Sequence, residues 1–329
     1  MLLLNRRVVE RLLDLDRLIE ALGPAMADLS AGRVSMPPRN ITLVSERGGL
    51  LGAMPVYLPA TRTLSTKLVS VFPENEAHGL PSHQAVIVVF DAETGAPRAL
   101  MDGTFITAAR TAAGSALSAR LLARPDAGVL LIIGTGVQAR AHAAAIPRVR
   151  PIREIRVVGR DPQKAARLAA QIAQEQGIKA LACEWVAQTF AGAHIICAAT
   201  HAAEPVVKGA WLDPGTHVTS VGLNPQGCEI DAEAVTKSLV VVESREAALA
   251  PNAGGANDLK WPIRDGLIGA DHIHAEIGEL ISGIKPGRTS ADQITFYKSV
   301  GVAVQDAVAA HLVLEAAGKQ GVGREVELK

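Results

Sequence analysis

The spacing of apolar residues along the chain first follows a helix and then changes to that of strands. Between residues 8 and 30, apolar residues recur every three or four positions, which predicts two packed helices separated at Gly23-Pro24. From residue 39 to residue 102, apolar and polar positions alternate, and short turns separate the runs. Successive strands joined by short turns predict an antiparallel sheet. Its strands are expected at residues 39–44, 50–58, 64–72, 85–91 and 100–102.

The pattern of apolar residues changes after a helix that is expected over residues 103–123. This helix is rich in Ala, Ser and Gly, and Pro125-Asp126-Ala127-Gly128 follows it as a turn. Apolar strands then alternate with helical segments, which predicts a doubly wound parallel sheet. Further helices are expected over 271–282 and 302–317. The strands are expected at 130–133, 152–158, 178–183, 193–198, 217–221, 239–243 and 294–301.

The two patterns together predict an α/β protein with two domains. A chain of 329 residues exceeds the usual size of a single domain. We expect a smaller α+β domain over residues 1–125 and a Rossmann domain over residues 126–301. The C-terminal segment, residues 302–329, is expected to return and complete the first domain.

A glycine-rich turn ends the first strand of the parallel sheet. Its sequence is Gly134-Thr135-Gly136-Val137-Gln138-Ala139. In a Gly-x-Gly-x-x-Ala turn the first glycine permits a tight bend and the second lets the backbone approach a pyrophosphate. The helix that follows directs its free N–H groups at the phosphates. With a strand before it and a second strand at βαβ distance, the turn predicts a dinucleotide site; a purely structural glycine turn is the alternative.

The end of the second strand bears on the choice of dinucleotide. Sites that prefer NAD usually carry an acid there, which binds the ribose 2′-hydroxyl. This chain has Gly159 and Arg160 instead, and Asp161 is followed by Pro162, which is typical of a helix N-cap. Space and positive charge favour NADP(H), with NAD(H) possible. The alternative is that Arg160 is an ordinary solvated surface residue.

Composition narrows the class of partner. The chain has 33 Lys and Arg and 33 Asp and Glu, and this balance argues against nucleic acids and anionic membranes as partners. No apolar run reaches the length of a membrane span, and no signal peptide is expected. Three cysteines without paired spacing favour a reducing compartment and hence a cytoplasmic protein. No metal site is expected, because His272 and His274 lie two residues apart, which does not suit a helical ligand pair.

Three cations lie on otherwise apolar elements of the first domain. Lys67 shares a strand face with Val69 and Val71, and Arg39 and Arg110 have similar apolar or small neighbours. A buried cation requires a partner. Together the three side chains can bind an anion such as an amino-acid carboxylate or a cofactor phosphate. The alternative is that each reaches water or pairs with a structural acid.

Four motifs together resemble the ornithine cyclodeaminase and μ-crystallin family over nearly the whole chain. They are Lys67 with Gly79-Leu80-Pro81-Ser82, residues 107–112, the turn at residues 134–139, and Lys298-Ser299-Val300-Gly301. The resemblance implies a homodimer in which the first domain, residues 1–125, binds the substrate and forms the subunit contact. It also implies that Arg39, Lys67 and Arg110 bind the substrate carboxylate, with Gly301 beside it. The residues implied at the dinucleotide are Ser82, Arg110, Thr111, Gly134, Thr135, Gly136, Val137, Gln138, Thr200, Val221, Gly222, Leu223 and Val300.

The chain departs from the cyclodeaminases of this family at one position. Those enzymes use an aspartate for acid-base chemistry in a segment that here reads Gly222-Leu223-Asn224-Pro225-Gln226-Gly227. An amide cannot accept a proton from an amine or a water. We therefore expect an NAD(P)H-dependent reductase of a cyclic α-imino acid, Δ1-pyrroline-2-carboxylate or Δ1-piperideine-2-carboxylate, that yields L-proline or L-pipecolate. Lys67, Arg110 and Asn224 are its expected catalytic residues, with Asn224 orienting the substrate nitrogen or the nicotinamide ribose.

Other functions remain open at this point. One is an ornithine cyclodeaminase that makes proline and ammonia with bound NAD, in which Glu229 replaces the missing base. Another, also implied by the resemblance, is an alanine-type or opine-type amino acid dehydrogenase. The last is a non-catalytic protein that binds a ligand in an NADP-dependent manner.

Overall fold

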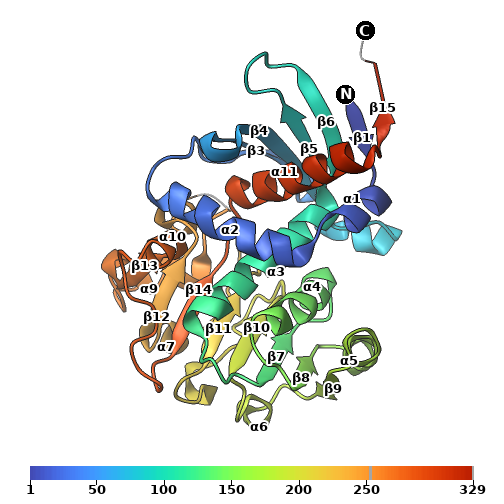
Figure 1. The fold of residues 1–329 in the computed structure, drawn as a ribbon. Coiled ribbons are helices and arrows are strands. Elements are labelled where there is room, and N and C mark those ends of the chain that lie inside the picture. The colour runs from blue at the N-terminus through green and yellow to red at the C-terminus, as the bar shows by residue number, and fades with distance from the viewer. Residues whose placement is uncertain (252–253, 328–329) are drawn as a thin grey trace. The chain divides into compact units, whose positions relative to one another are not determined.

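The computed structural model describes residues 1–251 and 254–327, and the chain divides into two compact units (Figure 1). One unit combines Met1–Arg110 with Val302–Lys329, and the other is Thr111–Gly301. The first boundary lies inside helix α3 (Gly103–Leu122), upstream of the turn at residues 125–128. The expected α/β class, with a Rossmann sheet and a smaller α+β unit, is confirmed.

The sheet of the first unit is built mainly from consecutive hairpins. Strands β2 to β6 pair antiparallel in chain order, and β1 joins the far edge parallel to β6. The expected strands are confirmed, whereas β1 and β15 are too short to give a pattern. The bounds are β1 Leu2–Leu4, α1 Arg6–Leu12, α2 Leu15–Ser30, β2 Asn40–Val44, β3 Gly49–Leu58, β4 Thr63–Val71, β5 His83–Phe90, β6 Pro97–Asp102, α11 Ala303–Gln320 and β15 Arg324–Glu325.

One face of this sheet forms the core of the first unit. Met54, Val56 and Ile87 are buried on it. Helix α11 packs against β3 and β4, and α2 packs against α11, as Figure 1 shows for the red and blue helices. The C-terminal helix therefore completes this core, and side chains on the same face of the strands meet it.

The break between the first two helices lies at Asp14, so the predicted break at Gly23-Pro24 is wrong. The side chain of Asp14 caps α2 by accepting a hydrogen bond from the Arg17 N–H at 2.9 Å. Helix α2 then continues through Pro24. Buried Leu22 and Met26 flank the proline, and their packing outweighs the local cost of the proline in a helix interior.

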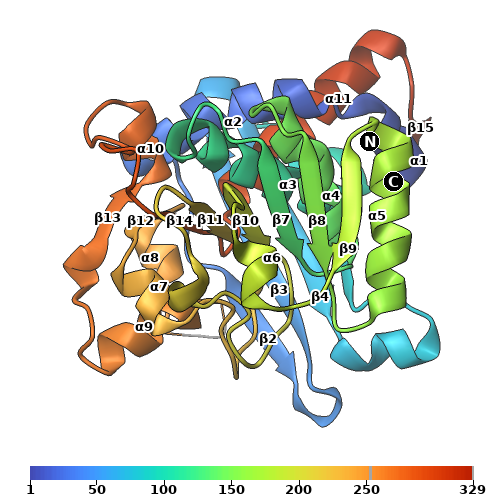
Figure 2. The ribbon, with the colours of Figure 1, turned by 90° about the horizontal axis from the view of Figure 1, so that it is seen from below.

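The described residues of the second unit form a parallel sheet of eight strands with helices around it, which Figure 2 shows from below. The strand order is β13-β12-β14-β11-β10-β7-β8-β9, so the order reverses between β7 and β10. The bounds are β7 Val129–Ile133, α4 Val137–Ala145, β8 Glu154–Val158, α5 Pro162–Gln176, β9 Lys179–Cys183, α6 Ala187–Phe190, β10 Ile195–Ala198, β11 His217–Ser220, α7 Ala232–Thr236, β12 Leu239–Val242, α8 Arg245–Ala248, α9 Asn257–Arg264, β13 Ile273–Glu276, α10 Ile277–Ile281 and β14 Thr295–Lys298.

The helix predicted over residues 271–282 is wrong for its first half, which forms strand β13. Ile273 pairs with Val240 of β12, and Ala275 is buried on the same edge of the sheet. Pairing with β12 therefore overrides the local helical pattern, and α10 begins only after Glu276, where a capping box starts it. Among the described residues, no helix has the length and apolar character needed to cross a membrane.

Candidate active site

Lys67 and Arg110 share one buried carboxylate in the first unit. Lys67 lies on the core face of β4 and is only 2% exposed. Its Nζ lies 2.8 Å from Oδ2 of Asp306 and 3.5 Å from Oγ1 of Thr107. The Nε of Arg110 donates to Oδ1 of Asp306 at 3.1 Å, and its Nη1 donates to Oε1 of Gln305 at 2.9 Å. The structure therefore brings these two predicted site residues together.

Asp306 was not identified from the sequence, although an acid in the apolar pattern of the last helix was an available signal. It lies in the first turn of α11, where the helix dipole favours a negative charge. Burial opposes its ionisation, but the charges of Lys67 and Arg110 hold its pKa below the ordinary value. One carboxylate offsets one of two positive charges. Lys67 and Arg110 thus keep one positive charge in excess, which suits an anionic ligand.

The electrostatic surroundings of this cluster include Arg39 and His83. Burial lowers the pKa of Lys67 to about 8, against the attraction of Asp306, and the charges of Arg110 and Arg39 lower it further. Burial and the charges of Lys67 and Arg110 lower the pKa of His83 to about 4. At pH 7 the imidazole of His83 is therefore neutral, while most Lys67 side chains carry a charge.

The glycine turn of the second unit has the geometry of a phosphate site. Gly134 has φ +129°, and a Cβ there would lie 2.4 Å from the carbonyl oxygen of Ala199. Gly136 is the N-cap of α4 without a side-chain cap. Apart from its two neighbours in the chain, no residue in the described structure has a heavy atom within 4 Å of the position of its missing Cβ. Space is therefore left where the first N–H groups of α4 can meet a pyrophosphate. Among the described residues, Oε1 of Gln138 is buried without a hydrogen-bond partner, which leaves it for a ligand.

The end of β8 has the helix cap expected from the sequence. Asp161 caps α5 by accepting hydrogen bonds from the N–H groups of Gln163 at 2.8 Å and Lys164 at 3.2 Å, so the predicted cap is confirmed. The bond from Lys164 is the main cause that lowers the pKa of Asp161. A Cβ at Gly159 would lie 2.5 Å from Cγ2 of Thr135, and Arg160 is exposed. The acid after β8 is therefore occupied, and the exposed charge beside it is positive.

The strands of the second half of the sheet end at the other residues that the family resemblance implies at the dinucleotide. Thr200 follows β10, Val221, Gly222 and Leu223 follow β11, and Val300 follows β14. Because these strands run parallel to β7, their carboxyl ends lie on the edge of the sheet that carries the glycine turn. Ligands of doubly wound sheets bind at this edge.

Three further predicted residues lie elsewhere. Ser82 is half-buried in the loop before β5, and Thr111 is buried in α3. Gly301 has φ +75°, a conformation that favours glycine, and its N–H donates to Oε2 of Glu243 at 2.8 Å. Their contacts with substrate or cofactor stay predictions.

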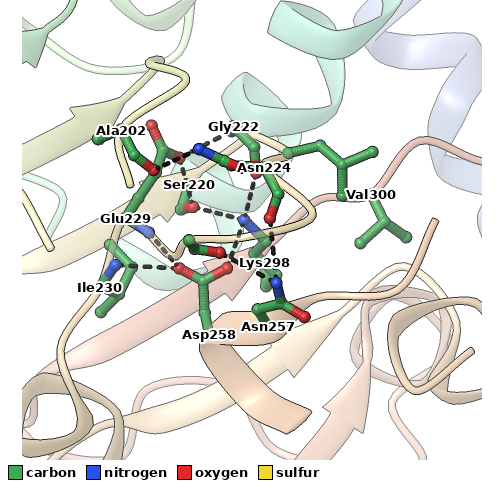
Figure 3. A network of polar contacts seen from close by, with 12 residues as sticks. Ala202, Ser220, Gly222, Asn224, Glu229, Ile230, Asn257, Asp258, Lys298 and Val300 are labelled. Carbon is green, nitrogen blue, oxygen red and sulfur yellow. Dashed lines mark hydrogen bonds and ion pairs between the residues drawn. The ribbon is translucent and has the colours of Figure 1, made fainter. Parts of the chain in front are cut away.

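Asn224 and Glu229 are both tied into the loop that follows β11 (Figure 3). The Nδ2 of Asn224 donates to the carbonyl oxygens of His201 and Ala202 at 3.1 and 3.2 Å, and its Oδ1 accepts from the Gln226 N–H at 2.9 Å. This is a structural role, and the catalytic role of Asn224 stays a prediction. Each carboxylate oxygen of Glu229 accepts two hydrogen bonds, so the geometry does not favour this residue as a replacement base.

Comparison with known proteins agrees with this arrangement of features. The sequence model of the ornithine cyclodeaminase/mu-crystallin family matches residues 1–321. The chain belongs to this family. The membership expected from the four motifs is thus confirmed. Among relatives within the family, the ketimine reductase mu-crystallin of Mus musculus is 37% identical over 302 residues, which are 91% of each chain.

Solved structures of related proteins resemble the fold closely. One is the Δ1-pyrroline-2-carboxylate reductase of Thermococcus litoralis in complex with NADH and L-proline, with a TM-score of 0.95 and 41% identity. The match covers 99% of this chain and all of that one. Another is an archaeal alanine dehydrogenase dimer with bound NAD, with a TM-score of 0.93 and 31% identity over 100% of this chain and 99% of that one.

Proposed function

We propose that this protein uses a reduced nicotinamide dinucleotide to convert a cyclic α-imino acid, Δ1-pyrroline-2-carboxylate or Δ1-piperideine-2-carboxylate, into L-proline or L-pipecolate. The observation that carries the proposal is the buried cluster of Lys67, Arg110 and Asp306, which has one positive charge in excess. A small α-carboxylate offsets that charge. The ligands of the Thermococcus litoralis reductase, NADH and L-proline, support this choice of substrate and cofactor.

In this proposal, different residues of the chain bind the substrate and the cofactor. Lys67 and Arg110, with Arg39 nearby, bind the substrate carboxylate, and Asp306 holds the two buried cations in place. The glycine turn at residues 134–139 binds the pyrophosphate of the cofactor. When bound, the reduced nicotinamide supplies a hydride for the imine carbon. The imine enters with its nitrogen protonated, so hydride addition completes the amine, and catalysis comes from positioning and electrostatics.

An amino acid dehydrogenase is the second candidate, because the archaeal alanine dehydrogenase shares the fold over the whole chain. Purified protein should therefore be assayed for loss of reduced-nicotinamide absorbance with each cyclic imine and, separately, with pyruvate and ammonia. Turnover of a cyclic imine supports the proposal. Turnover of pyruvate alone would replace it with the dehydrogenase, and ammonia release from ornithine would replace it with the cyclodeaminase.

We further propose that NADP(H) is preferred over NAD(H). The exposed Arg160 supplies positive charge after β8, and the carboxylate of Asp161 is engaged in capping α5. An acid that would bind the ribose 2′-hydroxyl is thus replaced by a cation suited to a 2′-phosphate. The solved relatives contain NADH or NAD, so the proposed preference for NADP(H) rests on the residues of this chain alone.

The proposed functional form is a homodimer. Leu51, Leu68 and Val86 are 48%, 36% and 41% exposed on the face of the first sheet opposite its core. Leu68 and Val86 are direct cross-strand neighbours, so the exposed apolar area is contiguous. A second copy of this face fits such a surface, and the archaeal relative is described as a dimer.

The free cysteines Cys183, Cys197 and Cys228 support a cytoplasmic location.

A further inference from the structure

The backbone N–H and carbonyl groups of Gly222 are both bound by buried charged residues (Figure 3). Its N–H donates to Oε2 of Glu229 at 2.7 Å, and its carbonyl oxygen accepts from Nζ of Lys298 at 2.8 Å. A Cβ at Gly222 would lie 2.2 Å from the carbonyl oxygen of Thr200 and 2.4 Å from Cδ of Glu229. The backbone of the loop after β11 is therefore fixed at this residue, and the position requires glycine.

Glu229 joins the ends of two strands. Its Oε1 accepts from the N–H and the hydroxyl of Thr200 after β10, at 2.6 and 2.7 Å. Its Oε2 accepts from the Gly222 N–H and from the hydroxyl of Ser220 on β11, both at 2.7 Å. The side chain of Glu229 is 2% exposed and makes these bonds without an ion-pair partner in the described structure. Four donors thus replace the hydration of the carboxylate.

Lys298 connects a third strand to the backbone of Gly222. It lies on β14, is fully buried, and directs Nζ at Oγ of Ser220, the Gly222 carbonyl and Oδ2 of Asp258, each at 2.8 Å. Asp258 in turn accepts from the Glu229 N–H at 2.8 Å through Oδ1. The three charged residues therefore form one connected network in which Ser220 bridges Lys298 and Glu229.

The position of this network in the sheet indicates which part of a bound dinucleotide lies next to it. Strands β7, β8 and β9 form one mononucleotide-binding half, and β10, β11 and β14 form the other. The glycine turn lies in the first half, whereas Thr200 and Gly222 lie at the carboxyl ends of the second. A dinucleotide spans the two halves, so the second half receives the nicotinamide part.

We propose that Glu229 and Lys298 are positioning residues that fix the backbone of Gly222 as a surface for the nicotinamide half of the cofactor, with Ser220 linking them. This inference rests on the proposed function in one respect, namely that the bound molecule is a nicotinamide dinucleotide. It assigns neither residue to proton transfer. The network sets the placement of the nicotinamide ring and so the distance over which the hydride moves.

The first test compares Glu229→Gln with wild-type protein in steady-state reduction of a cyclic imine. In this variant an NH2 group replaces one carboxylate oxygen of the side chain, whose size stays the same. The NH2 group can only donate hydrogen bonds, so it faces the two groups that donated to that oxygen. We expect kcat to fall about 10-fold to 100-fold, since misplacement by about 1 Å can cost that much. The primary isotope effect measured with cofactor deuterated at the transferred position should rise. Ser220→Ala, which leaves all charges in place, should change both quantities in the same direction by less.

Glu276→Gln is the matched control. Glu276 is a half-buried glutamate of the same unit that accepts a backbone hydrogen bond, from the Arg245 N–H at 2.8 Å, but it lies on the edge strand β13. Its kcat and isotope effect should stay at the wild-type values. Unchanged kcat and isotope effect in both Glu229→Gln and Ser220→Ala would overturn the proposal.

A binding measurement separates this inference from the proposed reaction. The affinity of each variant is measured for the whole reduced dinucleotide and for the matching ADP-ribose or 2′-phospho-ADP-ribose, which lacks the nicotinamide ring. We expect Glu229→Gln and Ser220→Ala to weaken binding of the dinucleotide and leave ADP-ribose binding within about threefold. Equal losses for both ligands would overturn the positioning role, and so would no loss for either. This readout holds even if wild-type protein reduces no imine, in which case only the proposed reaction fails.

Discussion

The affinity for carboxylate ligands should fall as pH rises through the pKa of Lys67. This side chain binds the substrate carboxylate as an ammonium, and its pKa in the folded protein is about 8 instead of 10.5 because it is buried. At pH 9, about one tenth of the side chains remain charged, whereas at pH 7 nearly all are. If only the charged form binds, the inhibition constant of a carboxylate ligand rises about tenfold between these two conditions.

L-proline is the suitable ligand for this measurement, because its carboxylate stays ionised throughout and the imine substrate itself titrates. Its competitive inhibition constant is determined between pH 6.5 and 9.5 in wild-type protein and in Asp306→Asn. Asp306 raises the pKa of Lys67 by attraction and by its 2.8 Å contact, so its removal should move the midpoint of the titration below 8. The mutant should also be less stable by about 3 to 5 kcal/mol, since it leaves two buried cations without their shared carboxylate.

Lys67→Met provides the control for the same titration. It removes the titrating group from a site that is 2% exposed, so its inhibition constant should be high and independent of pH in this range. Use of the imine should fall roughly a hundredfold or more, which corresponds to about 3 kcal/mol for a buried charge pair that loses one member. An inhibition constant of the wild-type protein that stays flat from pH 6.5 to 9.5 would refute the assignment of Lys67 to the carboxylate.

Three further predictions concern the cofactor, the pH dependence of stability and the dimer. Arg160→Asp should move the ratio of kcat/KM values from NADPH toward NADH, and an unchanged ratio would count against the 2′-phosphate site. Burial lowers the pKa values of His142 and His217 to about 4 and about 3, so these side chains take up protons in the unfolded chain before they do so in the folded protein as pH falls below 6.5. The free energy of unfolding measured by urea titration should therefore be about 2 kcal/mol lower per histidine at pH 5 than at pH 7. His142→Gln should lose less stability between these two pH values. Leu68→Glu should shift sedimentation toward the monomer, while Arg6→Glu should not.

Most of the fold follows from local signals in the sequence. The alternation of residues 39–102 and the apolar strand before Gly134 give the right elements because their side chains meet the core with the period of the strand. The errors occur where packing overrides that signal. Helix α2 continues through Pro24 because the residues around the proline are buried in a helix that packs against α11, and β13 forms because β12 offers an edge for pairing. Such partners are distant in sequence, so no local pattern shows them.

The candidate site was predictable only in part, for the same reason. Lys67 and Arg110 are conspicuous because they are cations on apolar elements, but their partner Asp306 lies about 200 residues or more further along the chain. Because Glu229 lies close to Asn224 in sequence, the sequence suggests it as a substitute base. The structure shows instead a carboxylate whose two oxygens each accept two hydrogen bonds. Its role depends on the strand ends that the fold brings together.

The two buried charge clusters differ in a way that bears on the chemistry. The cluster of Lys67, Arg110 and Asp306 keeps one positive charge in excess, which an incoming carboxylate can offset. The network of Glu229, Asp258 and Lys298 has one negative charge in excess, but hydroxyl and backbone N–H donors already satisfy its acids. The first cluster is therefore suited to bind an anion and the second to hold backbone in place. A reductase that receives a protonated imine needs both properties, whereas a cyclodeaminase also needs a base that can exchange protons with its substrate.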